Sequence, residues 1–167
     1  MLSIIIETSN HEDALSRTLL PLVSGAVQGL VRDVIVLDHG STDQTTRIAE
    51  QAGCTIMSGT TLSACISRAR GDWLLLLEPG ARVSANWVES VERHCASSQS
   101  PARFSRSLEG RPAFFSRIVR RETALIDGLL ITKKQASALA KSAVTSEALA
   151  RGLAGRKMNA EIVPAGR

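Results

Sequence analysis

Residues Val34–Asp43 read VIVLDHGSTD and form the most informative segment of the chain. Its first four residues are apolar and rich in β-branched side chains, which is typical of a buried strand. Asp38 follows directly, Gly40 permits a tight turn, and Ser41 or Thr42 can cap a helix that begins next. Ligands of open α/β sheets bind just outside the carboxyl ends of the strands. A carboxylate at this point therefore suits the base or ribose of a nucleotide.

The same pattern of an apolar run with a polar end occurs on either side of this stretch. Leu2–Ile6 is one such run, and Trp73–Leu77 is another, followed by Glu78-Pro79-Gly80. Helices are expected between the runs, over Glu12–Leu30, Asp43–Ala52 and Leu62–Arg70. Pro21 is expected to kink or split the first helix. Strands that alternate with helices predict right-handed βαβ units, whose strand ends gather at one edge of a parallel sheet.

Three segments resemble the family-2-type glycosyltransferases, which have the GT-A fold. The segments are Ser3–Asn10, Val34–Thr45 and Ala69–Glu78, and both their order and their spacing fit. The resemblance covers about residues 2–95 and implies an α/β, GT-A-like (Rossmann-like) domain, with a mostly parallel sheet flanked by helices. We expect residues 1–95 to form the nucleotide-sugar-binding half, and residues 96–167 a shortened acceptor half with C-terminal helices. An unrelated Rossmann-like binding domain is an alternative interpretation.

The activity implied by the resemblance is that of a glycosyltransferase of the hexosyltransferase type. Such an enzyme transfers a sugar from a nucleotide-diphosphate sugar, here a UDP-sugar, to a hydroxyl acceptor, with inversion at the anomeric carbon. The alternative is a catalytically inactive GT-A-like module that binds a nucleotide or a partner. The short second half and an altered metal motif favour this alternative.

Five residues are expected to bind the nucleotide because of this resemblance. Thr8 matches the nucleotide end of the first strand, and Glu12 and Asp38 match acids that hold the nucleoside. Ser41 and Asp43 match the loop that shapes the nucleoside pocket. A purely structural role is an equal alternative for these last two residues, since an acid is also favourable near a helix N-terminus.

The sequence departs from the family pattern at three positions. Glu7 stands where the family usually has a proline, and His39 stands where Asp or Gly is common. A lone histidine in a loop is more often solvated or hydrogen-bonded than a ligand. Gly80 replaces an acid of the metal motif, which leaves Glu78 as one oxygen ligand for a divalent cation, Mn²⁺ or Mg²⁺. The alternative is that Glu78-Pro79-Gly80 is only a turn, because proline fits its second position.

An inverting transferase also needs a general base for the acceptor hydroxyl. Candidate acids in the second half are Glu109, Glu122, Asp127, Glu147 and Glu161. Asp127 precedes Leu129-Leu130-Ile131, which resembles the late strand of the family after the acceptor loop, so Asp127 is the catalytic candidate to test first. The competing interpretation for Asp127 is a surface acid or the start of a strand.

The charge of the chain is unevenly distributed. Its 167 residues include 20 Lys and Arg against 16 Asp and Glu, a net charge of +4. The excess lies late, at Arg103, Arg106, Arg111, Arg117, Arg120, Arg121, Lys133 and Lys134. Three explanations compete: a solvated face, diphosphate binding by arginines in place of a metal, and attraction to anionic headgroups beside a lipid-linked acceptor. No nucleic-acid partner is expected, because Tyr is absent and aromatic residues make up 3% of the chain.

The cysteines and the hydropathy pattern bear on the location of the protein. Cys54, Cys65 and Cys95 lack metal-site spacing, and an odd number without a secretory context predicts reduced thiols that pack in the core. No signal peptide or transmembrane run is visible. We therefore expect a cytoplasmic protein, or one peripheral to the inner face of the membrane.

The remaining expectations concern the second half. Ala96–Pro101 is expected to be a linker, and Phe114-Phe115 an apolar anchor in the core or at a membrane. Further elements are expected as helices at Ala85–Cys95, Gln135–Lys141 and Ser146–Leu153, and as a strand at Met158–Pro164.

Overall fold

The structure is a computed structural model that describes residues 1–107 and 123–165. Several residues named above lie outside the described ranges: Phe114, Phe115, Arg111, Arg117, Arg120, Arg121, Glu109 and Glu122. The expectations attached to them stay predictions.

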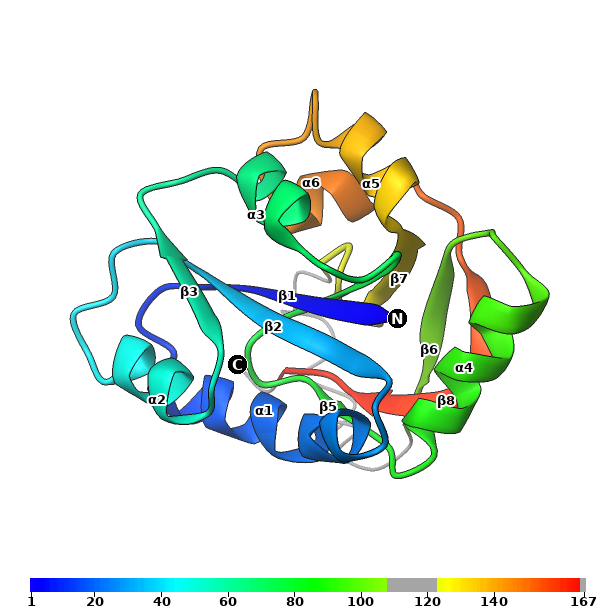
Figure 1. The fold of residues 1–167 in the computed structure, drawn as a ribbon, viewed down its shortest axis with the longest axis horizontal. Helices are drawn as coiled ribbons and strands as arrows, with labels where there is room; N and C mark the ends of the chain where they lie inside the picture. The colour runs from blue at the N-terminus through cyan, green and yellow to red at the C-terminus, as the bar shows by residue number, and fades with distance from the viewer. Residues whose placement is uncertain (108–122, 166–167) are drawn as a thin grey trace, which may run out of the picture.

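A single eight-stranded sheet forms the centre of the molecule, with strand order β3-β2-β1-β4-β7-β6-β8-β5 (Figure 1). The strands are β1 (Leu2–Thr8), β2 (Val31–Asp38), β3 (Thr55–Ser58), β4 (Trp73–Leu77), β5 (Arg82–Val83), β6 (Ala102–Arg106), β7 (Leu129–Thr132) and β8 (Arg156–Val163). The strands β3, β2, β1 and β4 are parallel to one another. β7 is antiparallel to both β4 and β6, whereas β8 is parallel to β6 and antiparallel to β5. The sheet is thus parallel around the first strands and mixed beyond β4.

Helices cover both faces of this sheet (Figure 1). One face is covered by α1 (Glu12–Val27), α2 (Thr45–Gln51) and α4 (Trp87–Ser97), and the other by α3 (Leu62–Arg68), α5 (Lys133–Leu139) and α6 (Ser146–Ala150). Successive side chains of a strand point to opposite faces. Accordingly, Ile4 and Ile6 join the core under α1, while Ile5 joins the core under α3. Strands buried on both faces read as continuous apolar runs, which is why these strands were visible in the sequence.

The expected α/β class is confirmed, and several bounds agree closely. β4 has the expected range, β1 and β2 extend to Thr8 and Asp38, and Leu129–Ile131 lies in β7. Pro21 lies inside α1 and does not split it, and the helix ends at Val27 rather than at Leu30. β3, β5 and β6 were not expected, because they are short and carry no long apolar run.

The N-cap expected for α2 is wrong. This helix begins at Thr45, and its N-cap is Gln44 without a side-chain hydrogen bond. The Ser41 hydroxyl is engaged elsewhere, because it accepts a hydrogen bond from the Asn10 N–H. The Asp43 carboxylate instead accepts from the Thr45 N–H at 3.0 Å and satisfies one of the first donors of the helix.

The three cysteines are free thiols in or against the core. Cys65 is buried, and Cys54 and Cys95 are half-buried. Burial raises the pKa of each thiol to about 11, so the reactive thiolate is scarce at neutral pH. Within the described ranges, no helix is long and apolar enough to cross a membrane.

Candidate functional site

The loops that follow β1 and β2 lie side by side at the carboxyl edge of the sheet, which we define as the edge where β1, β2 and β4 end. The strands are paired in parallel register, with Thr8 opposite Asp38. The His39 N–H donates to the Thr8 carbonyl oxygen at 2.9 Å. The polar residues that end the two strands therefore lie together, as their positions in the sequence predicted.

Asn10, in the loop after β1, is hydrogen-bonded to the loop after β2. Its φ of 55° is in the left-handed region, and no other residue except glycine has a positive φ in the described ranges. The Asn10 side-chain oxygen accepts from the N–H groups of Thr42 at 2.7 Å and of Asp43 at 3.3 Å. The Asn10 N–H donates to the Ser41 hydroxyl at 2.9 Å. Asparagine suits this place because its short polar side chain tolerates the left-handed conformation.

The three acids expected to bind a nucleotide all accept backbone hydrogen bonds within these loops. Asp38, 3% exposed, accepts from the Gly40 and Ser41 N–H groups, each at 3.1 Å. Glu12 accepts from the Gln44 N–H at 2.8 Å. Asp43 accepts from the N–H groups of Thr45 at 3.0 Å and of Glu12 at 3.2 Å.

The structure therefore brings the five expected residues together in one hydrogen-bonded unit, in which Thr8 is buried at the end of β1. The hydrogen bond with Thr45 lowers the pKa of Asp43, so this carboxylate stays ionised well below neutral pH. Contact between these residues and a nucleotide stays a prediction. Asn10 is the residue that sequence reasoning missed as a site residue, although the propensity of asparagine for left-handed turns could have indicated it.

Glu7 extends the unit towards the second half of the chain. Its Oε1 accepts from the Ser146 N–H at 2.7 Å and from the Ser146 hydroxyl at 2.8 Å. Its Oε2 lies 3.7 Å from His39 Nε2. The acid that replaces the usual proline of the family thus has partners on α6 and in the β2 loop.

The segment after β4 forms the expected turn. The Ala81 N–H donates to the Glu78 carbonyl oxygen at 3.1 Å, and Gly80 has a φ of 97°. Proline at the second position and a positive φ at the third define a type II turn. The Glu78 carboxylate accepts a hydrogen bond from the Thr123 hydroxyl.

Neighbouring residues leave little room for a side chain at Gly80, the position of the missing acid. A Cβ added at Gly80 would lie 3.2 Å from the Ala165 Cβ and 3.6 Å from the Ala14 Cβ. Glu78 is then the single carboxylate of this turn, whereas Mg²⁺ and Mn²⁺ need several oxygen ligands. In the part of the chain that the structure describes, no group of three or more His, Cys, Asp or Glu side chains could hold a metal ion. The described residues thus form no metal site of their own, and Glu78 is the one carboxylate that this turn offers to a cation.

Asp127 lies directly before β7 and is held by two cations. The Arg106 Nε and the Lys157 Nζ each lie 2.6 Å from its carboxylate, which is 13% exposed. Burial raises the pKa of Asp127, but the hydrogen bonds and charges of Lys157 and Arg106 outweigh it, and the net pKa is lowered. A general base works best with a pKa near the operating pH. In this arrangement the carboxylate is a weak base.

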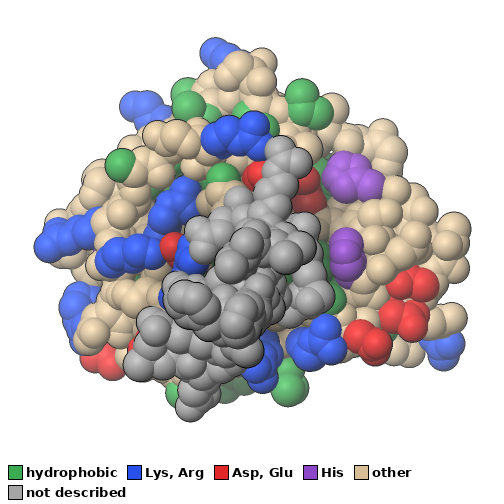
Figure 2. Space-filling model, turned by 180° about the vertical axis from the view of Figure 1, so that it is seen from behind, with side chains coloured by type: hydrophobic (Ala, Val, Ile, Leu, Met, Phe, Trp, Pro, Cys, Tyr) green, Lys and Arg blue, Asp and Glu red, His purple; other side chains and the backbone are tan. Residues whose placement is uncertain are grey.

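Arg103 and Lys133, two described residues of the basic stretch, donate hydrogen bonds to backbone carbonyl oxygens of other segments. The Arg103 guanidinium donates to the carbonyl oxygens of Ala124 at 2.6 Å and Ala150 at 2.9 Å. The Lys133 Nζ donates to the Ala69 carbonyl oxygen at 2.5 Å. Burial lowers the pKa of Arg103, which still leaves an arginine charged. Figure 2 shows that many of the visible Lys and Arg side chains lie to the left of the grey atoms, with the visible histidine side chains to their right.

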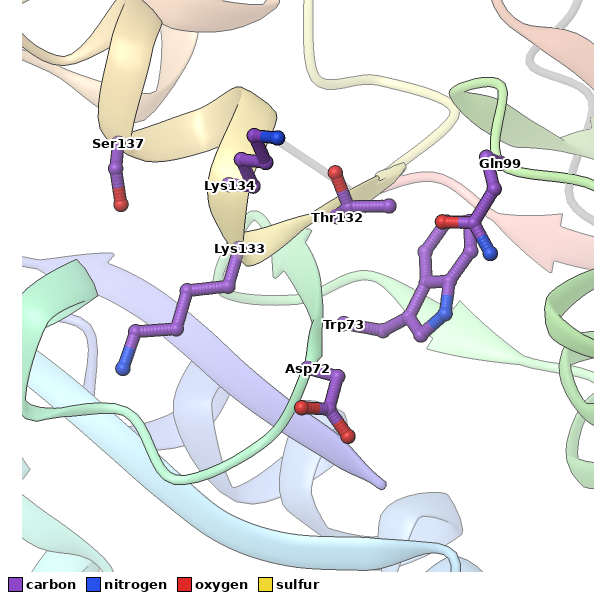
Figure 3. Close-up of a pocket in the computed structure, with 7 residues that line it drawn as sticks. All are labelled: Asp72, Trp73, Gln99, Thr132, Lys133, Lys134 and Ser137. Atoms are coloured by element: carbon purple, nitrogen blue, oxygen red, sulfur yellow. The ribbon is translucent and has the colours of Figure 1, made fainter.

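A pocket of about 490 Å³ lies at the opposite edge of the sheet (Figure 3). Its lining residues come from the start of β4, the end of β7, α5 and the loop before β6: Asp72, Trp73, Gln99, Thr132, Lys133, Lys134 and Ser137. The amino group of Lys133 is already bound to carbonyl oxygens. Because its lining residues lie at the edge where β4 begins, this pocket is separate from the unit formed by the β1 and β2 loops.

Neither a protein-family model nor a curated protein matches the chain. Solved structures do match. Glucosyl-3-phosphoglycerate synthase from Mycobacterium tuberculosis aligns with 100% of this chain and 72% of its own, with a TM-score of 0.70 and 18% identity. The same enzyme in complex with Mn²⁺, UDP and glucosyl-3-phosphoglycerate gives a TM-score of 0.69 at 16% identity. TarS from Staphylococcus aureus aligns with 94% of this chain and 57% of its own, with a TM-score of 0.66 and 17% identity.

The chain therefore has the GT-A fold of glycosyltransferases, as the sequence predicted. It spans 59% of the length of another UDP-bound structure of the synthase. At these identities the likeness establishes the architecture, and the activity has to be argued from the residues of this chain.

Proposed function

We propose that the protein binds a nucleotide-diphosphate sugar, specifically a UDP-sugar, and transfers its sugar to a hydroxyl acceptor with inversion. The observation that carries this proposal is the unit of interlocked β1 and β2 loops around buried Asp38. It lies at the carboxyl edge of the strands, where α/β folds bind ligands. The likeness to a synthase in complex with UDP and Mn²⁺ supports the choice of donor.

Asp38 and Glu12 hold the nucleoside in this proposal, and Thr8 lines the site. A carboxylate has about four acceptor positions, so Asp38 can accept from a base N–H while it keeps its bonds to Gly40 and Ser41. Ser41 and Asp43 shape the loop beside it. The donor is thus recognised by groups whose positions are already fixed by the backbone, which lowers the entropic cost of binding.

The departing diphosphate needs electrostatic stabilisation, and the described residues form no metal site of their own. We propose that cationic side chains supply it, and that Glu78 contributes at most one ligand to a transient cation. Arg106 ends β6 at the carboxyl edge, and Lys157 lies next to it on Asp127. The role that we propose for Asp127 is to orient these two cations, and its role as a general base stays the weaker prediction.

A second candidate function is a GT-A-like module that binds a nucleotide or a protein partner without catalysis. Two observations favour it: the closed position at Gly80 and the double ion pair of Asp127. The identity of the acceptor, a lipid-linked acceptor and peripheral membrane contact stay predictions for either candidate.

The test is calorimetric titration of the protein with UDP and GDP, each with and without Mn²⁺. We expect UDP to bind without metal, with binding lost in Asp38→Ala and retained in Asp72→Ala, whose side chain is 88% exposed at the opposite edge. Melting curves of both variants exclude unfolding as the cause. Binding that requires Mn²⁺ would contradict the cationic stabilisation, and failure to bind either nucleotide would contradict the proposed function.

Release of UDP from UDP-glucose separates the two candidates. Turnover by the protein, alone or with an acceptor, supports the transferase. Nucleotide binding without turnover supports the module.

A further inference from the structure

Glu7 joins two parts of the fold that are far apart in the sequence. It belongs to β1, while its partner Ser146, the first residue of α6, is 139 residues away. The carboxylate takes both donors of Ser146, the N–H at 2.7 Å and the hydroxyl at 2.8 Å. Ser146 is only 2% exposed. Because Ser146 is shielded from water, its two donors depend on Glu7 as their hydrogen-bond acceptor.

The backbone of α6 explains why an acceptor is needed there. The first N–H groups of a helix have no partner within the helix. The Thr145 hydroxyl accepts from the Ala148 N–H at 3.1 Å, so it satisfies a different donor. Glu7 supplies the acceptor for the Ser146 N–H, and a buried donor without an acceptor would be costly.

The other oxygen of Glu7 points towards the nucleotide loops. Oε2 lies 3.7 Å from Nε2 of His39, the residue directly after Asp38. Glu7 follows Ile5 on the face of the sheet that α3 and α6 cover, as Figure 1 shows for these helices. A single carboxylate thus links the start of α6 to the loop that contains Asp38.

We propose that Glu7 is a positioning residue, which docks α6 against the carboxyl edge and so makes this helix a supporting wall of the nucleotide site. The link to nucleotide binding rests on the function proposed above. Leu149 and Ala150 of α6 lie in the same core cluster as Leu37, which precedes Asp38. Loss of the Glu7 contact therefore loosens α6 first and the Asp38 loop second.

Hydrogen–deuterium exchange and UDP titration of the same variants test this proposal. Glu7→Ala removes both contacts, Glu7→Gln keeps one acceptor oxygen, and Ser146→Ala keeps the backbone contact. Arg151→Ala is the matched control, because Arg151 is the C-cap residue of α6, its guanidinium pairs with Glu147 3.1 Å away, and its side chain is 72% exposed.

We expect amide exchange in α6 to rise about tenfold in Glu7→Ala, in keeping with the loss of a hydrogen bond to a charged group. The affinity for UDP should fall severalfold in the same variant. Glu7→Gln should lie between Glu7→Ala and the unsubstituted protein in both measurements, and Arg151→Ala should change neither.

Two results would overturn the proposal: unchanged exchange of α6 in Glu7→Ala, or faster exchange with unchanged UDP affinity. The first would show that Glu7 does not dock α6, and the second that α6 does not support the site. If the unsubstituted protein binds no UDP, the proposed function fails, and with it the supporting role of α6. The exchange data would then still decide whether Glu7 docks this helix.

Discussion

The carboxyl edge of the sheet has two regions that use acidic residues differently. In the β1 and β2 loops, Glu12, Asp38 and Asp43 accept hydrogen bonds from backbone N–H groups. Beside β4 and β7, Glu78 and Asp127 are bound by side chains, the hydroxyl of Thr123 and the cations of Arg106 and Lys157. Acids in the first region fix the course of the backbone, whereas acids in the second hold other side chains in place.

The two regions also differ in the space around one glycine of each, Gly40 in the first and Gly80 in the second. Gly40 and Gly80 both have a positive φ, of 80° and 97°. Among the residues that the structure describes, none would contact a Cβ at Gly40 within 4 Å apart from its immediate neighbours, whereas a Cβ at Gly80 would meet Ala165 and Ala14. The first loop is therefore open to a ligand in front of Gly40, and the turn after β4 is covered by protein.

The largest effect on stability is expected for substitutions of Asn10, which links the two loops of the first region by hydrogen bonds. Asn10→Ala loses the side-chain acceptor and places alanine in the left-handed region, which together should lower the free energy of unfolding by about 3 kcal/mol. Asn10→Asp keeps an acceptor oxygen and should lose much less, with Asn10→Gly between the two. Urea denaturation measures all three. Equal losses for Asn10→Ala and Asn10→Asp would show that the side-chain oxygen does not hold the loops together.

The ion pairs of the second region should give the next effect. Asp127→Asn should lower the free energy of unfolding by about 2 kcal/mol at pH 7, because Arg106 and Lys157 each lose their ion pair with this carboxylate. The folded pKa of Asp127 is lowered, so its stabilisation is complete above the unfolded value of about 4 and is lost as the pH falls through the folded value. Denaturation between pH 7 and pH 3 should therefore show the two proteins converging in acid. A difference that stays constant over this range would contradict the ionic origin of the effect.

The two glycines provide a direct contrast between the regions. Gly40→Ala should cost about 1 kcal/mol, the strain of a left-handed alanine in open space. Gly80→Ala should cost about 2 kcal/mol, since the added methyl group also presses on Ala165. Thermal denaturation of both variants measures the difference. Identical melting temperatures would mean that the segment around Ala165 moves aside freely.

The smallest effect is expected for the exposed ion pair between Glu147 and Arg151. Arg151→Ala should change the free energy of unfolding by no more than about 0.5 kcal/mol, because the pair with Glu147 is exposed and spans one turn of a helix. Chemical denaturation in low and high salt measures it. A loss as large as that of Asp127→Asn would remove the distinction between a pair of exposed side chains and the pairs made by the half-buried Asp127.

Sequence reasoning succeeded where a local pattern determines the structure. Continuous apolar runs identify β1, β2 and β4, and the acid, glycine and hydroxyl residues after β2 indicate its turn. Pro79 and Gly80 likewise indicate the turn after β4. Each of these features depends on residues within one short segment.

Features that depend on distant partners could not be predicted in this way. Nothing near Glu7 indicates that Ser146 completes its hydrogen bonds, and nothing near Asp127 indicates Lys157. The hydrogen bonds of the Arg103 guanidinium could not be predicted either, because their carbonyl acceptors belong to two other segments of the chain. None of the three explanations given for the basic stretch included the hydrogen bonds that Arg103 donates to backbone carbonyl oxygens within the protein.

The position of β8 has a consequence for the order of folding. This strand is made late in synthesis, yet it pairs with β6 on one side and with β5 on the other, so that residue 163 lies opposite residue 82. Contacts between segments so far apart form slowly, because a long loop must close first. The strands β1, β2, β3 and β4 can assemble on the ribosome before β8 emerges, whereas β5 must wait for it. The strands that carry the β1 and β2 loops are thus expected to assemble early, and the part of the sheet formed by β6, β8 and β5 later.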